Sequence, residues 1–312
     1  MDYTIKRFHA GLINDFEYIY KATHENHFSK EWFYKKFDTK YAGAEDISFI
    51  AYSTDNEPAA FYGVFPTIGS RSGKTIRIAQ SGETMTHPSH RNKGLFKALF
   101  FKTMELAKEN GIEFFFGFPN KNSFPGFIKF GWTTPFNTKK YIVPVEETLI
   151  TRIQKRFFPK LIIAKRRNAV SQLKIDKAEA IDIYQKNNNA PDILQINRNQ
   201  EYIRYKSYSD NFFVRTASAL LWIKIEENTL YIGDIVVLQL KGDFLEELKQ
   251  LAKKLQLTSI LFFASPAHQS PVAFNPFLIA DDSMPFILYQ LNSDMDPLAY
   301  PFIYTSADFD TF

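Results

Sequence analysis

A strand–helix–strand order occurs twice along the chain, and this repetition limits the possible folds more than any single motif does. The strand-like segments "SGETM" (81–85) and "IGDIV" (232–236) are each followed by an amphipathic helix. Each helix is then followed by an apolar strand, "EFFFGF" (113–118) in the first half and "SILFFA" (259–264) in the second. The matching order indicates a diverged internal duplication within an α/β chain.

The periodicity of apolar residues predicts the elements around these repeats. In the first half it predicts a strand at 3–8, helices at 14–23 and 29–37, and strands at 47–53, 57–69 and 74–87. In the second half it predicts two strands within 218–238, a helix at 242–256 with Asp243 as its N-cap, and a final strand at 285–291. The first-half helix begins near Gly94 and ends at Asn110-Gly111, where Gly accepts the left-handed conformation.

Length and composition exclude several classes of protein. A chain of 312 residues is long enough for about two domains that each bury a core. No apolar run reaches the roughly 18 residues of a membrane-spanning helix. The absence of cysteine excludes disulfides, thiolate metal sites and a Cys nucleophile. The start "MDYTIKRFHAGL" lacks the pattern of a signal peptide, so we expect a cytoplasmic protein.

A basic, Gly-containing turn precedes the first-half helix. Arg91, Asn92, Lys93 and Gly94 stand where the helix N-terminus presents unpaired amides and a partial positive charge. Gly lets the backbone approach an anion closely, and the two basic side chains add formal charge. The turn therefore favours phosphate or pyrophosphate binding, although it matches neither the Walker loop nor the Rossmann fingerprint. The alternative is a charged turn that merely precedes a helix.

The turn and its surroundings resemble a known family. "HRNKGLFKAL" resembles the pyrophosphate loop of the GNAT superfamily of CoA-dependent N-acyltransferases. The longer stretch "SGETMTHPSHRNKGLF…GIEFFFGFPNKNSFPGFIKFGW" is similar to a bacterial subgroup with tandem GNAT-like domains, often associated with acylation of surface polysaccharides or amino sugars. The resemblance implies tandem domains, each a mixed, mostly antiparallel twisted sheet flanked by helices, with a degenerate second copy.

The resemblance also implies a set of cofactor contacts. Acyl-CoA, most simply acetyl-CoA, would be the co-substrate, and its pantetheine arm would pair with β-strand backbone as an added strand. The implied cofactor-binding residues are Met85, Thr86, Arg91, Asn92, Lys93, Gly94, Leu95, Phe96, Asn120 and Ser123. Two residues depart from the family pattern: Phe96 replaces the small last residue of the loop, and Phe127 replaces the Tyr that protonates the leaving thiolate in many members.

The reaction needs a base to deprotonate the attacking amine. Glu83, on the strand that leads to the turn, is the first candidate, and an ordinary strand carboxylate is the alternative. His87 is the second candidate, although a His before Pro88 is often a turn residue. Without cysteine, direct attack of the amine on the thioester in a ternary complex is the simplest mechanism. His24 and His27 lack a third ligand nearby, so no metal is expected.

Most of the positive charge belongs to one segment. Residues 152–170 hold seven Lys and Arg and no acid, and without them the chain has 31 basic and 34 acidic residues. This distribution makes nucleic acid an improbable partner. The segment is either a solvated connector or a patch for peripheral contact with an anionic membrane or acceptor.

Three domains are predicted: a GNAT domain with the CoA loop at 1–150, a basic connector at 151–190 and a degenerate GNAT-like domain at 191–312. Asp243 at the second helix start would repel a pyrophosphate, so the second domain is expected to complete the acceptor cleft or a homodimer surface. The predicted function is transfer of an acetyl or short acyl group to an amine of a small molecule or amino sugar. The alternatives are a non-catalytic CoA-binding scaffold and a Fem-like aminoacyl transferase.

Overall fold

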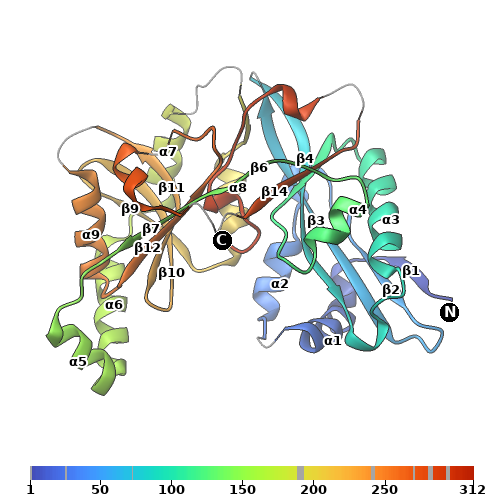
Figure 1. Ribbon diagram of the computed structural model, residues 1–312, viewed down its shortest axis with the longest axis horizontal. Coiled ribbons are helices and arrows are strands. Elements are labelled where there is room, and N and C mark those ends of the chain that lie inside the picture. The colour runs from blue at the N-terminus through green and yellow to red at the C-terminus, as the bar shows by residue number, and fades with distance from the viewer. Residues whose placement is uncertain are drawn as a thin grey trace.

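The protein consists of two lobes that lie side by side, each built around one sheet (Figure 1). The computed structural model describes residues 2–24, 27–71, 73–187, 193–239, 243–269, 271–279, 284–292 and 296–312. The N-terminus lies at the outer edge of the first lobe, and the C-terminus lies between the lobes. Helices flank both sheets, so the mixed, mostly antiparallel α/β class predicted from the sequence is confirmed.

The sheet of the first lobe has a long central pair of strands. Its main strands, in spatial order, are β1 (Thr4–Arg7), β2 (Phe49–Tyr52), β3 (Pro58–Arg71), β4 (Lys74–Thr86), β5 (Phe114–Gly117), β14 (Pro285–Gln290) and β6 (Thr133–Asn137). Two short strands, β8 (Leu194–Ile196) and β15 (Phe302–Ile303), extend it through pairing of β8 with β3. Neighbours along the main path are antiparallel except β4 and β5, which are parallel.

Helices cover both faces of this sheet. Helices α1 (Ile13–Thr23) and α2 (Lys30–Phe37) pack with Phe61 and Met85, whereas α3 (Leu95–Glu109) and α4 (Phe124–Lys129) belong to the cluster that contains Tyr62 and Val64. Because successive strand residues point to opposite faces, the two clusters lie on opposite sides of the sheet. Ser29 caps α2 by accepting a hydrogen bond from the Trp32 amide, which explains where that helix begins.

The sheet of the second lobe repeats the same order. Its strands are β13 (Leu278–Ile279), β7 (Lys139–Pro144), β12 (Ser259–Ala264), β11 (Thr229–Val237), β10 (Ala219–Glu226) and β9 (Asn211–Arg215). As in the first lobe, the strand before the helix and the strand after it, β11 and β12, are parallel. Helix α9 (Phe244–Lys254) connects them and is capped by Asp243, as predicted. The remaining helices are α5 (Leu149–Phe157), α6 (Pro159–Leu173), α7 (Lys177–Asn187) and α8 (Gln200–Tyr205).

The two lobes exchange one strand each, which the sequence did not indicate. Strand β7, from the first half of the chain, lies between β12 and β13 in the second sheet. Strand β14, from the second half, lies between β5 and β6 in the first sheet. Neither sheet is therefore formed by one continuous stretch of the sequence. Strand β7 belongs to the second sheet although it precedes residue 150. The division into domains at 150 and 190 stays a prediction.

Each lobe has an irregularity at the equivalent place on its central strand. In β4 the register with β3 shifts between Gly82 and Met85, and Glu83 has φ +51°. In β11 the register with β10 shifts between Ile232 and Asp234, on either side of Gly233. A bulge turns a side chain out of the regular pleat and often marks a functional site. The equivalence of the two bulges supports the internal duplication.

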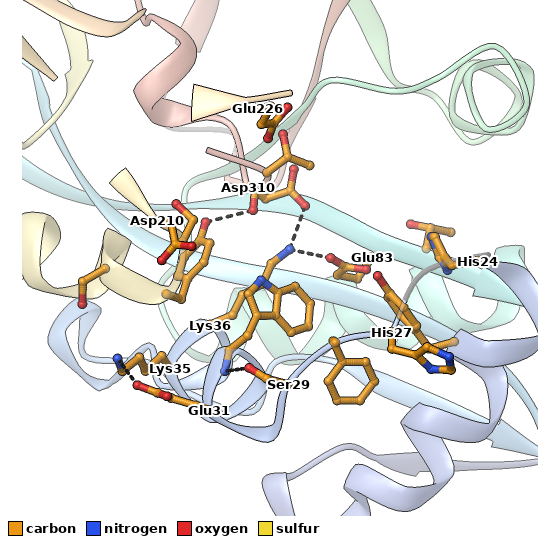
Figure 2. A pocket seen from close by; sticks show the side chains of 18 of the residues that line it. His24, His27, Ser29, Glu31, Lys35, Lys36, Glu83, Asp210, Glu226 and Asp310 are labelled. Atoms are coloured by element: carbon orange, nitrogen blue, oxygen red, sulfur yellow. Dashed lines mark hydrogen bonds and ion pairs between the residues drawn. The ribbon is translucent and has the colours of Figure 1, made fainter. Parts of the chain in front are cut away.

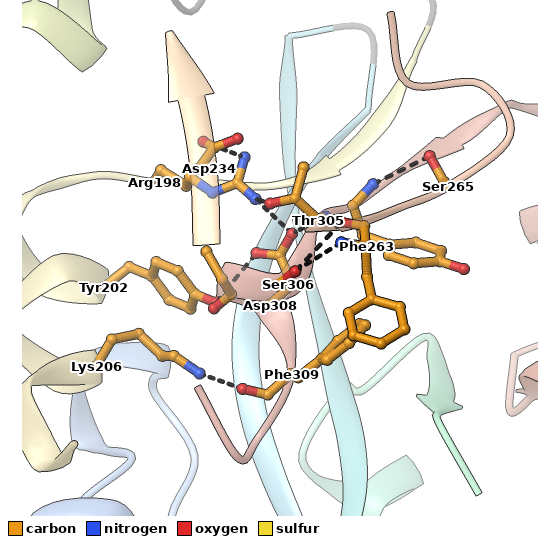
Figure 3. A network of polar contacts seen from close by, with 12 residues as sticks. Arg198, Tyr202, Lys206, Asp234, Phe263, Ser265, Thr305, Ser306, Asp308 and Phe309 are labelled. Atoms are coloured by element: carbon orange, nitrogen blue, oxygen red, sulfur yellow. Dashed lines mark hydrogen bonds and ion pairs between the residues drawn. The ribbon is translucent and has the colours of Figure 1, made fainter. Parts of the chain in front are cut away.

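The C-terminal segment 305–312 lies between the lobes, and its side chains are buried except those of Asp310 and Thr311 (Figure 3). Arg198 donates to Asp308 (2.5 Å) and contacts Asp234 (3.1 Å), and all three side chains are almost inaccessible. Burial raises the pKa of the Asp308 carboxyl, while the Arg198 guanidinium beside it acts in the opposite direction. Phe302, Phe309 and Phe312 are also buried and belong to one hydrophobic cluster.

Replacing Gly233 by Ala tests whether this segment holds the lobes together. A Cβ at Gly233 would overlap the Phe312 ring, so Gly233→Ala should lower the free energy of unfolding by about 1–3 kcal/mol in urea denaturation. The double variant Gly233→Ala/Phe312→Ala should be less destabilised than the sum of the single variants, because the smaller residue removes the overlap. Strict additivity would show that Gly233 and Phe312 are not in contact.

Candidate functional site

The turn before α3 has the backbone of an anion-binding loop. Asn92 (φ +60°) and Gly94 (φ +75°) both adopt the left-handed conformation, and Gly94 directly precedes the helix. No side chain caps the helix, and its first turn contains no acid. The first amides of α3 are therefore available to an external acceptor, with Arg91 and Lys93 beside them. The second lobe differs, since the Asp243 carboxylate occupies the start of α9.

A cavity of about 740 Å³, which we call the loop cavity, lies against this turn. All ten residues predicted to bind the cofactor line it: Met85, Thr86, Arg91, Asn92, Lys93, Gly94, Leu95, Phe96, Asn120 and Ser123. The Asn120 side chain accepts hydrogen bonds from the amides of Asn122 (2.9 Å) and Ser123 (3.0 Å), which fixes the turn that leads into α4. The fold thus brings the end of β4, the basic turn and the start of α4 to one cavity.

A second cavity of about 310 Å³, the strand cavity, lies where β4 and β5 separate. The two strands are paired only from Ala79–Phe115 to Ser81–Gly117, and β4 continues to Thr86 beside β3 alone. The edge of β4 that faces β5 is therefore unpaired after Ser81. An extended chain with amide groups could pair with this edge as an added strand. Thr84, Asn120 and Ser123 line both this cavity and the loop cavity.

A third cavity of about 840 Å³, the interlobe cavity, is lined by residues of both lobes (Figure 2). The first lobe supplies residues of α2, the segment before it and β4, and the second lobe supplies Ser207–Asp210 and Glu226. Glu83, Asp310 and Thr311 line both this cavity and the strand cavity. The junction of the two cavities is thus lined by two carboxylates, Glu83 from β4 and Asp310 from the C-terminal segment.

The two carboxylates share one buried cation. Lys36 donates to Glu83 (2.5 Å) and to Asp310 (3.3 Å), and its own side chain is only 1% exposed (Figure 2). Burial lowers the pKa of the Lys36 ammonium, but the two carboxylates raise it further and hold it above its ordinary value. Asp310 also packs against Gly82, where a Cβ would lie 2.5 Å from the carboxylate oxygen. Two acids around one cation leave a net negative charge at the junction, suited to accept a proton from a cationic amine.

His87 lies apart from this junction. Its ring stacks on Tyr18 (5.3 Å between centroids), its Nδ1 is hydrogen-bonded to Ser89 Oγ (2.6 Å), and it lines none of the three cavities.

The ligand atoms of His87, His90 and Glu57 lie within 4.8 Å of one another, a spacing that could hold a metal ion. Tyr18 donates a hydrogen bond to Glu57, and His90 is hydrogen-bonded to Tyr3. These contacts connect α1 with the residue before β3, and the segment after β4 with the residue before β1. His24 and His27 line the interlobe cavity and belong to no group of three metal ligands among the described residues.

Aromatic residues occupy the two positions that depart from the family pattern. Phe127 is buried and packs edge-to-face on Phe96 (5.0 Å) and on Trp132 (4.9 Å). Phe96 also lies over Gly126, where a Cβ would approach its ring to 2.8 Å. The bulk of Phe96 is thus packed against α4, and the strand cavity has an apolar wall where a Tyr hydroxyl would otherwise stand.

Asp310 is the site residue that sequence reasoning did not select. Its segment, "YPFIYTSADFDTF", contains two acids near apolar residues, which suggests packing. The structure assigns the two acids to different environments: Asp308 is fully buried against Arg198, and Asp310 reaches the cavities. In the sequence, Asp308 and Asp310 resemble a carboxylate pair, but nothing in that pattern shows that only Asp310 reaches the cavities.

Comparisons with known proteins agree with this geometry. Residues 6–134 match the model of the acetyltransferase (GNAT) domain. Among solved structures, the fold is similar to a GCN5-related N-acetyltransferase from Kribbella flavida (TM-score 0.61, 11% identity, 93% of this chain and 72% of that one). It is also similar to a probable N-acyltransferase from Enterococcus faecalis V583 (0.61, 13%, 93% and 73%) and to Saccharomyces cerevisiae N-myristoyltransferase with bound myristoyl-CoA (0.58, 12%, 93% and 79%). No curated protein matches the chain in sequence.

Most of the first lobe and its uncapped basic turn thus lie within the part of the chain that matches an acetyltransferase domain. Residues 6–134 match the GNAT acetyltransferase domain, and the fold of the chain is that of GCN5-related N-acetyltransferases. Within the described residues, the structure contains no helix long and apolar enough to cross a bilayer.

Proposed function

We propose that the protein transfers an acetyl or other short acyl group from acyl-CoA to an amine of a small molecule or amino sugar. The observation that carries the proposal is the continuity of three cavities: Thr84 and Asn120 line all three, and the strand and interlobe cavities meet at Glu83 and Asp310. The loop cavity fits a pyrophosphate, the strand cavity fits an extended pantetheine arm, and the interlobe cavity is open to an acceptor. The thioester would then lie at the junction, beside the two carboxylates.

The chemistry follows from the groups at that junction. The acceptor nitrogen attacks the thioester carbonyl, forming a C–N bond, and the C–S bond breaks to release CoA thiolate. Glu83 accepts the amine proton, and Asp310 is the second carboxylate within reach of the same cation. A backbone amide on the edge of β4 that is unpaired after Ser81 polarises the carbonyl. With Phe127 in place of Tyr, the thiolate takes its proton from water, because a thiol pKa of about 8.5 makes it a stable leaving group.

The charge of the interlobe cavity favours a cationic acceptor. Five carboxylates line it against two lysines: Glu31, Glu83, Asp210, Glu226 and Asp310 against Lys35 and Lys36. Both lysines are already paired, Lys35 with Glu31 (2.7 Å) and Lys36 with the junction carboxylates. Asp210 is exposed at the rim and has no hydrogen bond or ion pair to its side chain within the described part of the chain. We infer that the acceptor carries a second positive charge, which Asp210 contacts.

The function is tested by release of CoA thiol from acetyl-CoA in the presence of a panel of amines. The panel should contain monoamines, diamines, polyamines and amino sugars, and acylated products should be identified by mass spectrometry. We expect transfer of the acetyl group to at least one amine, with dicationic acceptors preferred. If the protein binds acetyl-CoA and acylates no amine, the non-catalytic CoA-binding alternative replaces the transferase.

Removing either junction carboxylate should slow the chemical step. Glu83→Gln should lower kcat by about 10²–10⁴-fold, with Asp310→Asn lowering it less, while the affinity for acetyl-CoA is retained. Steady-state kinetics and calorimetric titration separate the two effects. Glu105→Gln, at an exposed carboxylate on α3, is the control and should behave as the wild type. Turnover by Glu83→Gln at the wild-type rate would contradict its role as base.

Asp210→Asn tests the acceptor class. It should raise KM for a diamine by about two- to five-fold, the range of an exposed charge pair, and leave kcat unchanged. The KM of a monoamine of the same length should not move. Equal effects on both acceptors would contradict a specific contact between Asp210 and a second ammonium group.

A further inference from the structure

Helices α5 and α6 form a hairpin that projects from the second lobe, at the side away from the first lobe (Figure 1). Fourteen large apolar residues are exposed in the described chain, and seven of them lie between residues 149 and 163. These seven are Leu149, Ile150, Ile153, Phe157, Phe158, Leu161 and Ile163. Isolated exposed apolar residues need no explanation, but such a concentration marks an interaction surface.

The apolar residues of α5 form one stripe. Leu149, Ile150, Ile153 and Phe157 follow the helical spacing i, i+1, i+4 and i+8, which places them on one side of the helix. Leu149, Ile150 and Phe157 are 64–70% exposed, and no residue of α5 is buried. Phe158, at the connection to α6, extends the stripe. The apolar side of α5 is thus presented to the outside rather than to the protein core.

The same hairpin is strongly basic. Its helices contain seven Lys and Arg and no acid, and Arg156, Lys160 and Arg167 are exposed without an acidic partner in the described part of the chain. On the helical wheel Arg156 lies along one edge of the apolar stripe, so charge and apolar surface meet on the same side, whereas Arg152 and Lys155 contact Glu147 just before the helix. A partner for this surface must accept apolar side chains and supply negative charge beside them.

The hairpin is held firmly by its second helix. Arg166 donates to the carbonyls of Glu227 (2.7 Å) and Leu255 (3.0 Å), at the turn of β10–β11 and the end of α9. Ala169 belongs to the core cluster of the second lobe, with Val170 and Leu173 packed against it. The C-terminal part of α6 therefore anchors the hairpin, and α5 is displayed from a rigid base.

We propose that the α5–α6 hairpin docks the protein onto the surface of an anionic lipid bilayer. The apolar stripe enters the boundary between headgroups and acyl chains, and the flanking Arg and Lys side chains contact lipid phosphates. Each basic residue near an anionic surface contributes roughly five-fold in affinity, so charge complementarity distinguishes this partner from a neutral one. This mode of docking does not require a membrane-spanning helix, and none is found among the described residues.

A second copy of this chain is the other occupant to consider, and charge disfavours it. A two-fold contact through the same stripe would bring together those basic residues of the two hairpins that have no acidic partner in the described chain, Arg156 and Lys160 among them. The two helices contain no acid, and the nearby Glu147 already contacts Arg152 and Lys155. The bilayer surface supplies the negative charge that a second hairpin lacks.

Vesicle flotation tests the proposal on the full chain. Wild-type protein should bind vesicles of phosphatidylcholine with about 30% phosphatidylserine at least ten-fold better than pure phosphatidylcholine vesicles, and added salt should weaken the binding. Ile150→Asp/Phe157→Asp should lose binding at least ten-fold. Arg156→Glu/Lys160→Glu should lose the preference for anionic lipid. Val272→Asp, at a 79% exposed apolar residue outside the hairpin, is the matched control and should bind as the wild type.

The altered side chains are exposed, so all variants should unfold at the wild-type urea midpoint and keep acetyl-CoA binding. Absence of binding to anionic vesicles at low salt, or binding that neither double variant changes, would overturn the proposal. A dimer in light scattering that Ile150→Asp/Phe157→Asp dissociates would assign the hairpin to a second copy instead.

Discussion

Two buried cations fix how the halves of this protein meet. Each contacts one carboxylate from a strand bulge and one from the C-terminal segment: Lys36 contacts Glu83 and Asp310, and Arg198 contacts Asp234 and Asp308. Leaving such a cation without its partner in the interior costs about 3–5 kcal/mol. The C-terminal segment must therefore thread between both bulges, and the exchanged strands β7 and β14 bring the two sheets to the same place.

Near the bulge of each lobe a buried cation lies between two carboxylates, but the two sites differ in exposure and in role. Around Arg198 the carboxylate side chains are at most 5% exposed, and Tyr184 and Tyr202 complete the hydrogen bonds, so this network is structural. Around Lys36 the carboxylates are 12% and 19% exposed and border the cavities. The N-termini of the corresponding helices also differ. Helix α3 has no side-chain cap and follows a basic turn, whereas α9 is capped by Asp243. One copy thus offers a place for an anionic cofactor, and the other closes it.

Local features of this fold could be predicted from the sequence, and features that depend on long-range pairing could not. The strand–helix–strand order, the Asp243 cap and the basic turn follow from patterns within a few residues. The exchange of β7 and β14 leaves no such pattern, because a strand's alternation does not say which sheet it joins. For the same reason the sequence could propose Glu83, on the strand before the turn, but could not bring Asp310 to it across most of the chain.

We propose that the turn before α3 holds the pyrophosphate of acyl-CoA. The decisive experiment is calorimetric titration of the full chain with acetyl-CoA, beside the Arg91→Glu/Gly94→Asp variant. The wild type should bind at one site in the micromolar range and the variant should lose this binding, because two carboxylates would then face the phosphates. If the wild type does not bind, or if both proteins bind equally, the turn does not hold the pyrophosphate.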